Sequence, residues 1–134
     1  LRSARQEFPD RQITVLFGCT GGKGVDRRAD MGRAAGALAD RIILTEDDPG
    51  PERVEDICAE IGRSIAPSGK GWTVIPDREE AVRQAILGCG VPAVVVLAGK
   101  GCEQLQKRKN GPEPCVPDGM LARTFLEEAD RLRR

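Results

Sequence analysis

The sequence contains no histidine and no tyrosine, and its only aromatic residues are three phenylalanines and one tryptophan among 134 residues. Without histidine, the chain lacks the side chain that most often titrates near neutral pH and most often ligates zinc. So few aromatic rings also argue against a surface that binds single-stranded nucleic acid by stacking. These absences exclude histidine-based catalysis and disfavour zinc sites and nucleic-acid platforms.

Net charge is also lacking, because 21 lysines and arginines balance 21 aspartates and glutamates. A neutral chain has no overall field that attracts nucleic acid or an anionic membrane. No apolar run approaches the length of a membrane span, and no signal peptide is visible. The five cysteines are widely spaced and form no CxxC pair, which predicts the reduced thiols of a cytoplasmic protein.

The length predicts a single domain with its own hydrophobic core. Because Leu1 is not a natural start, we expect a piece of a longer polypeptide. Four apolar or β-branched segments predict strands, namely residues 13–17, 41–45, 72–75 and 93–98. The expected helices cover residues 1–8 and 31–39, a segment from Pro51 to Ile65, a segment capped by Asp77, and a last one capped by Asp118.

This alternation predicts an α/β domain of Rossmann-like architecture, with three layers around a mostly parallel sheet. The continuous apolar run of residues 93–98 predicts a central parallel strand. Residues 107–117, with an Asn-Gly pair and three prolines, predict an irregular hairpin at the sheet edge. Three loops that follow strands should meet at the carboxyl edge of the sheet, where such folds bind ligands.

The first of these loops, residues 18–24, is rich in glycine and carries Lys23. The interval from glycine to lysine is one residue short of a P-loop, and Gly24 stands where a P-loop has serine or threonine. A dinucleotide GxGxxG pattern does not fit either. The default interpretation is a tight turn from strand to helix, which leaves open that Lys23 contacts an anionic group.

The second loop carries three consecutive acids, Glu46, Asp47 and Asp48, followed by a Pro-Gly pair. Acids at the end of a buried strand suit a cationic partner such as an ammonium group, a metal ion or an arginine. The alternative is a solvated turn in which Asp48 caps the helix that begins near Pro51. The residues alone leave both interpretations open.

The third loop places Gly99 and Gly101 on either side of a lysine, directly after the most apolar strand. Two glycines there let the backbone approach a ligand closely, and Glu103 follows as a candidate ligand group. The alternative is an ordinary connection with an exposed glutamate. Cys102 is not expected to be a nucleophile, because the chain has no histidine to activate it.

Together the three loops resemble the C-terminal domain of the Mur ligases, specifically of UDP-N-acetylmuramoyl-tripeptide synthetases, which add the third residue of the peptidoglycan stem peptide. That family carries, in this order, an FGCGGDRD-like loop, an Asp-Asn-Pro or Asp-Asp-Pro loop, and an AGKGHE-like loop. The corresponding stretches here are residues 17–24, 47–50 and 98–103, and residues 77–81 also match. The resemblance covers nearly the whole chain.

The resemblance implies that residues 1–134 are the amino-acid-binding domain of a multidomain ligase. In the family reaction, ATP with Mg²⁺ phosphorylates a stem-peptide carboxylate, and the amine of an amino acid attacks the acyl phosphate. The implied partners are UDP-N-acetylmuramoyl-dipeptide, a diamino acid and the central ATPase domain of the same polypeptide. No catalytic residue, metal site or ATP site is expected within these residues, so the chain alone is predicted to lack ligase activity.

The resemblance also assigns roles to residues. Lys23 takes the position of an arginine that pairs with the amino-acid carboxylate, although lysine lacks the bidentate fork. The amino acid would lie near Asp47 and Asp48, and its amino end would be held at Gly99 and Glu103.

Members that add diaminopimelate have Asp-Asn-Pro-Arg in the second loop, where the arginine grips the second carboxylate. Gly50 occupies that position here. An acidic loop without this arginine suits lysine or ornithine rather than diaminopimelate.

Two other interpretations remain open from the sequence. One is a non-catalytic Rossmann-like module that binds a small molecule or anion. The other is a different ligase of the same superfamily, such as a relative of folylpolyglutamate or cyanophycin synthetases. Glu103 and the acidic loop disfavour the latter, because an enzyme that adds glutamate would want cations there. A GxxGKS or GxxGKT motif upstream in the reading frame would favour the ligase over the binding module.

Overall fold

The computed structural model describes residues 1–21, 25–89, 93–101 and 103–133. Its main sheet has four strands in the order β3-β2-β1-β4, and neighbouring strands are parallel. The strands are β1 Gln12–Phe17, β2 Arg41–Leu44, β3 Thr73–Val74 and β4 Ala93–Leu97. The helices are α1 Arg2–Glu7, α2 Val25–Leu38, α3 Val54–Ile65, the 3-10 turn η1 Ala66–Ser68, α4 Arg78–Leu87 and α5 Asp118–Leu132. No helix in these ranges is both long and apolar enough to cross a membrane.

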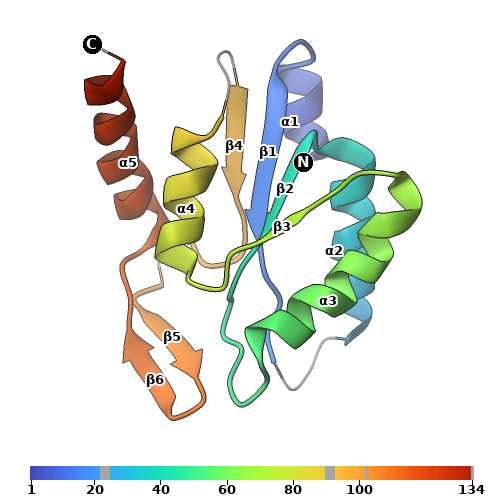
Figure 1. Cartoon of the computed structure of the whole chain (residues 1–134), viewed down its shortest axis with the longest axis vertical. Coiled ribbons are helices and arrows are strands. Elements are labelled where there is room, and N and C mark those ends of the chain that lie inside the picture. The colour runs from blue at the N-terminus through green and yellow to red at the C-terminus, as the bar shows by residue number, and fades with distance from the viewer. Residues whose placement is uncertain (22–24, 90–92, 102, 134) are drawn as a thin grey trace.

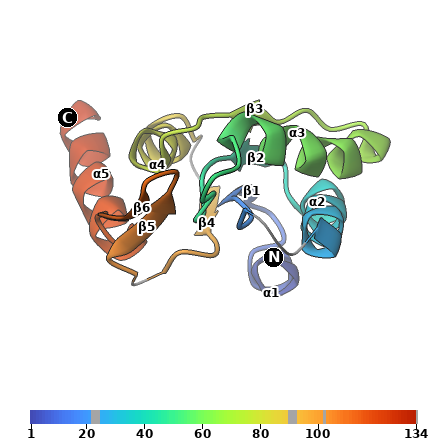
Figure 2. The same cartoon turned by 90° about the horizontal axis from the view of Figure 1, so that it is seen from below.

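Helices cover both faces of the sheet, which confirms the predicted three-layer α/β fold (Figure 1, Figure 2). Successive side chains of a strand point to opposite faces, so β1 sends Phe17 into a core with α2 and α3, and Leu16 into a core with α4 and α5. The next strand divides its side chains in the same way, with Ile42 in the first core and Ile43 in the second. The predicted burial of β2 on both faces is therefore confirmed.

The strand β4 lies at one end of the strand order, although its apolar sequence predicts a central position. Within the described chain it pairs with β1 alone, and its five side chains are all partly exposed. The prediction of a parallel strand is confirmed, and the prediction of a central one is wrong.

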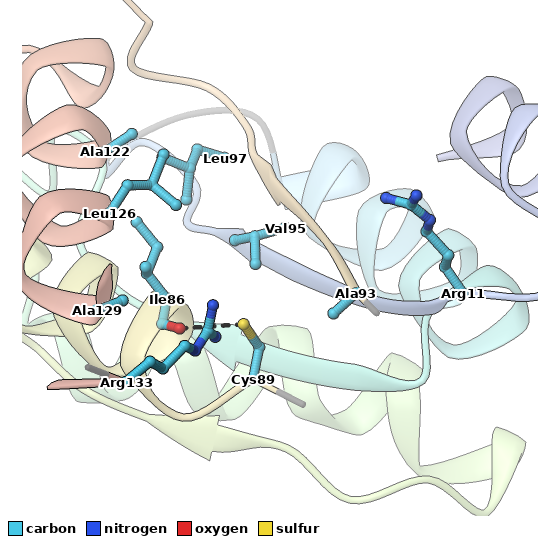
Figure 3. Close-up of a pocket in the computed structure, with 10 residues that line it drawn as sticks. All are labelled: Arg11, Ile86, Cys89, Ala93, Val95, Leu97, Ala122, Leu126, Ala129 and Arg133. Atoms are coloured by element: carbon cyan, nitrogen blue, oxygen red, sulfur yellow. Dashed lines mark hydrogen bonds between the residues drawn. The ribbon is translucent and has the colours of Figure 1, made fainter. Parts of the chain in front are cut away.

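Hollows flank β4 on both faces. One of about 460 Å³ lies between β4 and the helices α4 and α5 (Figure 3). Its lining is mostly apolar, with two arginines and one cysteine: Arg11, Ile86, Cys89, Ala93, Val95, Leu97, Ala122, Leu126, Ala129 and Arg133. The other, of about 420 Å³, lies beside α2 and is also mainly apolar. The edge position thus leaves apolar surface on β4 uncovered.

The predicted hairpin consists of β5 Leu105–Arg108 and β6 Gly111–Pro114, which pair antiparallel in a two-stranded sheet of their own. It lies beyond the carboxyl ends of β1 and β4 (Figure 1), instead of extending the main sheet. The backbone N–H of Gly50 donates to the carbonyl of Lys107 at 3.0 Å, which joins the hairpin to the segment after β2. The hairpin therefore lies at the edge where parallel sheets bind ligands.

The helix α2 begins at Val25, six residues before the predicted start at Met31. Its first turns therefore include the basic residues Arg27 and Arg28, which lie before the predicted start. Arg28 is buried, and its guanidinium donates to Glu52 at 2.9 Å and to Glu60 at 2.6 Å. These contacts tie α2 to the segment that enters α3 and to α3 itself.

Two further helix starts differ from prediction, and one agrees. The third helix begins at Val54 instead of Pro51. Asp77 caps α4 as predicted, because its carboxylate accepts a backbone N–H three residues on at 3.0 Å. Asp118 does not cap α5: it is the first helical residue, and its carboxylate binds Arg78.

Candidate functional site

Three consecutive acids follow β2, and the first of them serves the fold. Glu46 is 6% exposed, and its carboxylate oxygens accept hydrogen bonds from the Arg108 guanidinium at 2.5 and 3.1 Å. The carboxylates of Glu46 and Glu113 raise the pKa of Arg108 above its usual value. This ion pair fastens the hairpin to the end of β2. Glu46 does not line the pocket that Asp47 and Asp48 border.

Asp48 occupies a left-handed backbone conformation with φ of +49°, which is uncommon outside glycine. Its Oδ1 accepts hydrogen bonds from Lys100 Nζ at 2.6 Å and from the backbone N–H of Lys107 at 2.8 Å. Burial alone would raise the pKa of Asp48, but these two donors outweigh it and hold the pKa below its usual value. Because Arg53 precedes α3 at the N-cap position, the interpretation of Asp48 as a helix cap is wrong.

The carboxylate of Asp47 lies against the backbone of Gly99. A Cβ atom at Gly99 would stand 2.6 Å from Asp47 Oδ2, and the φ of +103° there also favours glycine. Burial raises the pKa of Asp47, the positive charge of Arg78 opposes that rise, and the charge of Asp48 adds to it. No hydrogen bond or ion pair joins Asp47 to another described residue. Its oxygens therefore have acceptor capacity left for a ligand.

A buried lysine, Lys100, joins Asp48 to Glu103. Lys100 is 2% exposed, and its Nζ donates to Asp48 at 2.6 Å, to Glu103 at 3.2 Å and to the carbonyl of Leu105 at 2.6 Å. Burial would lower the pKa of Lys100, but the two carboxylates outweigh it and raise the pKa. The lysine therefore remains charged and holds Asp48 and Glu103 near each other.

These groups border a pocket of about 180 Å³, smaller than the roughly 300–1,000 Å³ of sites for drug-sized ligands. The lining residues come from the three loops and from α2: Gly18, Cys19, Thr20, Arg27, Met31, Asp47, Asp48, Gly99 and Glu103. Four of the six residues predicted from the sequence thus meet at one site, namely Asp47, Asp48, Gly99 and Glu103. We call this site the acidic pocket.

Two predicted site residues are not part of the acidic pocket as described. Gly50 does not line it; its φ is +59°, and an added Cβ would meet no atom within 4 Å. Lys23, like Cys102, lies outside the described residues. Arg27 is a cation of the lining that sequence reasoning missed, because the helix that carries it begins earlier than its pattern indicates.

The described part of the glycine-rich loop packs directly on the acidic loop. A Cβ at Gly21 would lie 1.7 Å from the Pro49 carbonyl oxygen, and a Cβ at Gly18 would lie 2.2 Å from that of Thr45. The N–H of Gly21 donates to the carbonyl of Asp48 at 3.0 Å. A side chain therefore has no room at Gly18 or at Gly21, as in a tight turn from strand to helix.

The one described cysteine of the acidic pocket is not an activated nucleophile. Burial raises the pKa of the Cys19 thiol to about 11, so it stays protonated and unreactive near neutral pH. No group of acids or cysteines able to hold a metal ion occurs in the part of the chain that the structure describes. The lining offers carboxylates to a cationic group and the Arg27 guanidinium to an anionic one.

A parallel α/β sheet with such a pocket at its carboxyl edge defines a Rossmann-like domain, and domains of this kind commonly bind ligands at that edge. Comparison with known proteins identifies the family of the chain. It belongs to the family described as "Mur ligase, glutamate ligase domain", which matches residues 1–101.

Several relatives resemble the chain over most of its length. The UDP-N-acetylmuramoyl-L-alanyl-D-glutamate--L-lysine ligase of Enterococcus faecalis is 40% identical over 129 residues, which are 96% of this chain and 25% of the relative. The UDP-N-acetylmuramyl-tripeptide synthetase of Lactobacillus delbrueckii subsp. bulgaricus is 37% identical over 131 residues, which are 98% of this chain and 25% of the relative. The UDP-N-acetylmuramoyl-L-alanyl-D-glutamate--2,6-diaminopimelate ligase of Chlorobaculum tepidum is 41% identical over 98 residues, which are 73% of this chain and 19% of the relative.

The fold of the chain is also similar to that of a solved ligase structure. The structure of a UDP-N-acetylmuramoyl-L-alanyl-D-glutamate--2,6-diaminopimelate ligase superimposes with a TM-score of 0.82 at 28% identity, and covers 98% of this chain and 27% of the other. The chain therefore spans about a quarter of the length of the relatives that it matches. Both lysine and diaminopimelate ligases are among them, so the family alone does not select the amino acid.

Proposed function

We propose that this chain is the amino-acid-binding domain of a ligase that adds a diamino acid to UDP-N-acetylmuramoyl-L-alanyl-D-glutamate. The observation that carries the proposal is the meeting of Asp47, Asp48 and Glu103 around one small pocket at the carboxyl edge of the sheet. The relatives described above supply the reaction class, since their names are those of synthetases and ligases in this step.

The charges of the acidic pocket match a zwitterion with an additional ammonium group. Arg27 on α2 offers a cation for the substrate carboxylate, and Lys23 of the preceding loop is proposed as a second one. Asp48 and Glu103 share Lys100, whereas the charge of Asp47 has no ion-pair partner among the described residues. Asp47 is therefore the proposed primary contact of a substrate ammonium group.

The amino acid that fits these charges best is lysine or ornithine. Diaminopimelate carries a second carboxylate, which would need a further cation beside three acids. Gly50 brings no side chain to the position where the resembled diaminopimelate-adding enzymes have an arginine.

In the proposed reaction, ATP with Mg²⁺ would activate the stem-peptide carboxylate as an acyl phosphate on the other domains of the full-length ligase. This chain would bind and orient the amino acid so that its amine reaches that carboxylate. The glycine-rich loop lacks the spacing of a P-loop, which supports a division of labour in which ATP binds elsewhere. We therefore propose that the purified chain alone releases no phosphate from ATP in the presence of the UDP-linked substrate.

The proposal is tested by the substrate preference of the full-length ligase. We expect kcat/KM for L-lysine or L-ornithine to exceed that for meso-diaminopimelate by about tenfold or more, since leaving a buried polar group unpaired costs about 1–3 kcal/mol and a charged group costs more. ATP-dependent phosphate release, with each amino acid varied at saturating UDP-linked dipeptide, gives these values. The reverse order would overturn the specificity, and turnover with none of the three would overturn the ligase function.

Gly99→Ala is expected to weaken amino-acid binding, because its Cβ would stand 2.6 Å from Asp47 Oδ2 and displace that carboxylate. We expect KM for the amino acid to rise about tenfold, a typical cost of misplacing a substrate contact. Gly101→Ala is the matched control, since Gly101 also has a positive φ, +56°, but an added Cβ meets nothing within 4 Å. Equal changes in KM for both variants would attribute the effect to backbone strain and contradict the proposed contact.

A further inference from the structure

Arg78, the first residue of α4, does not line the acidic pocket, but it ties together two backbone segments that do. It is 5% exposed. Its Nη1 donates to the carbonyl of Glu46 at 2.9 Å, and its Nη2 donates to the carbonyl of Ala98 at 3.0 Å. These carbonyls belong to the residues that directly precede Asp47 and Gly99.

The two segments have no direct connection through the sheet. The strand β1 lies between β2 and β4, so no ladder hydrogen bond joins the end of β2 to the end of β4. The guanidinium of Arg78 spans this separation. The fit of Asp47 against Gly99 is tight, because the site has no room there even for a Cβ atom. A small change in the spacing of the two segments would therefore change the position of the Asp47 carboxylate.

The orientation of the guanidinium is fixed from its other side. Asp118, the first residue of α5, accepts hydrogen bonds from Nε at 2.9 Å and from Nη2 at 2.7 Å, and is itself 4% exposed. Two parallel bonds of this kind hold the plane of an arginine, which lysine cannot reproduce. A buried ion pair often adds little net stability over an apolar pair. This one also directs two guanidinium N–H groups at the two carbonyls.

We infer that Arg78 is a positioning residue for the acidic pocket, holding Asp47 and Gly99 at the separation that binding of the substrate ammonium group requires. The inference rests on the proposed function of the pocket. It assigns a role at the pocket to Arg78, which belongs to residues 77–81, a stretch with no other part in the site. The positive charge of Arg78 acts in the same direction, because it favours the ionised form of Asp47 and opposes the effect of burial on its pKa.

The test uses the full-length ligase with the variants Arg78→Lys and Asp118→Asn. We expect KM for the amino acid to rise about ten- to hundredfold in Arg78→Lys, the range for a displaced substrate contact, and less in Asp118→Asn. KM for ATP and for the UDP-linked dipeptide should stay unchanged, and kcat should change less than KM. Arg83→Lys is the matched control, since Arg83 also joins α4 to α5, through Glu128 at 2.9 Å, but contacts neither carbonyl.

Other results would overturn the inference. A rise in KM for all three substrates together, or a fall in kcat at constant amino-acid KM, would show that Arg78 does not act through the acidic pocket. Loss of a cooperative thermal transition in both variants would assign the ion pair to folding alone. A wild-type enzyme that turns over no amino acid would instead overturn the proposed function of the pocket, so the two failures are distinguishable.

Discussion

Replacing Lys100 by methionine is expected to lower the free energy of unfolding by about 3 kcal/mol, a size typical of removing one partner from a buried ion pair. Methionine matches the length of lysine but leaves Asp48 and Glu103 without their shared cation. It also removes the donor to the carbonyl of Leu105. Urea unfolding of the chain, followed by the fluorescence of Trp72, its only tryptophan, would measure the change.

The matched control is Lys109→Met, which removes the same charge from the exposed turn of the hairpin. We expect it to change the free energy of unfolding by less than about 0.5 kcal/mol. The variant Asp48→Asn, alone and combined with Lys100→Met, completes a double-mutant cycle, and the combined loss should be smaller than the sum of the two. Equal effects of the two lysine substitutions would contradict the ion-pair account.

The same pair gives stability a defined dependence on pH. The pKa of Asp48 is lowered on folding, so its contribution is present above its unfolded pKa of about 3.9 and is lost as pH falls through the folded value. The pKa of Lys100 is raised, so its contribution is present below about 10.4 and is lost as pH rises through the folded value. The difference in stability between wild type and Lys100→Met should therefore be largest between these limits.

Asp47→Asn is expected to impair the enzyme and stabilise the domain. Loss of a charge-assisted contact to the ammonium group, worth about 1.5–3 kcal/mol, should raise KM for the amino acid by about ten- to hundredfold. The unfolding free energy of the free chain should rise by about 1 kcal/mol, because an ionised carboxylate with no hydrogen-bond partner among the described residues is removed from a partly buried position. Amino-acid titration of the full-length ligase and urea unfolding of the chain measure the two effects.

The sign of the stability change follows from the raised pKa of Asp47. Ionisation is harder in the folded state, so this carboxyl makes the fold less stable as pH rises above its unfolded pKa of about 3.9. Asp40→Asn is the matched control. The pKa of Asp40 is lowered by hydrogen bonds from the Ile13 backbone and from Arg5, so the same substitution should destabilise there. A loss of stability in Asp47→Asn would contradict the description of its carboxylate as unpartnered.

The convergence of the site was predictable because parallel strands end at one edge of a sheet. Once residues 13–17, 41–45 and 93–98 are taken as parallel strands, the acids after β2 and Gly99 after β4 must lie near one another. The position of β4 was not predictable in this way. A continuous apolar run indicates that both faces of a strand suit burial, but it does not show which strands stand beside it.

The cations of the site were harder to predict than the acids. Lys100 and Arg78 read as surface charges in the sequence, and only the tertiary packing buries them between carboxylates and carbonyls. Arg27 was missed because glycines precede its helix and hide where it starts. Asp118 satisfied the pattern of a helix cap, but in the fold a buried guanidinium competes for the same carboxylate and binds it.

The uncovered edge of β4 has a consequence for work with the isolated chain. Three consecutive valines, Val94, Val95 and Val96, lie on a strand whose outer backbone groups have no ladder partner among the described residues. Exposed edges of this composition are templates on which a strand of a second molecule can add. Aggregation, more than unfolding, should therefore limit the concentration at which the 134-residue chain can be handled, and a charged residue on β4 should raise that limit.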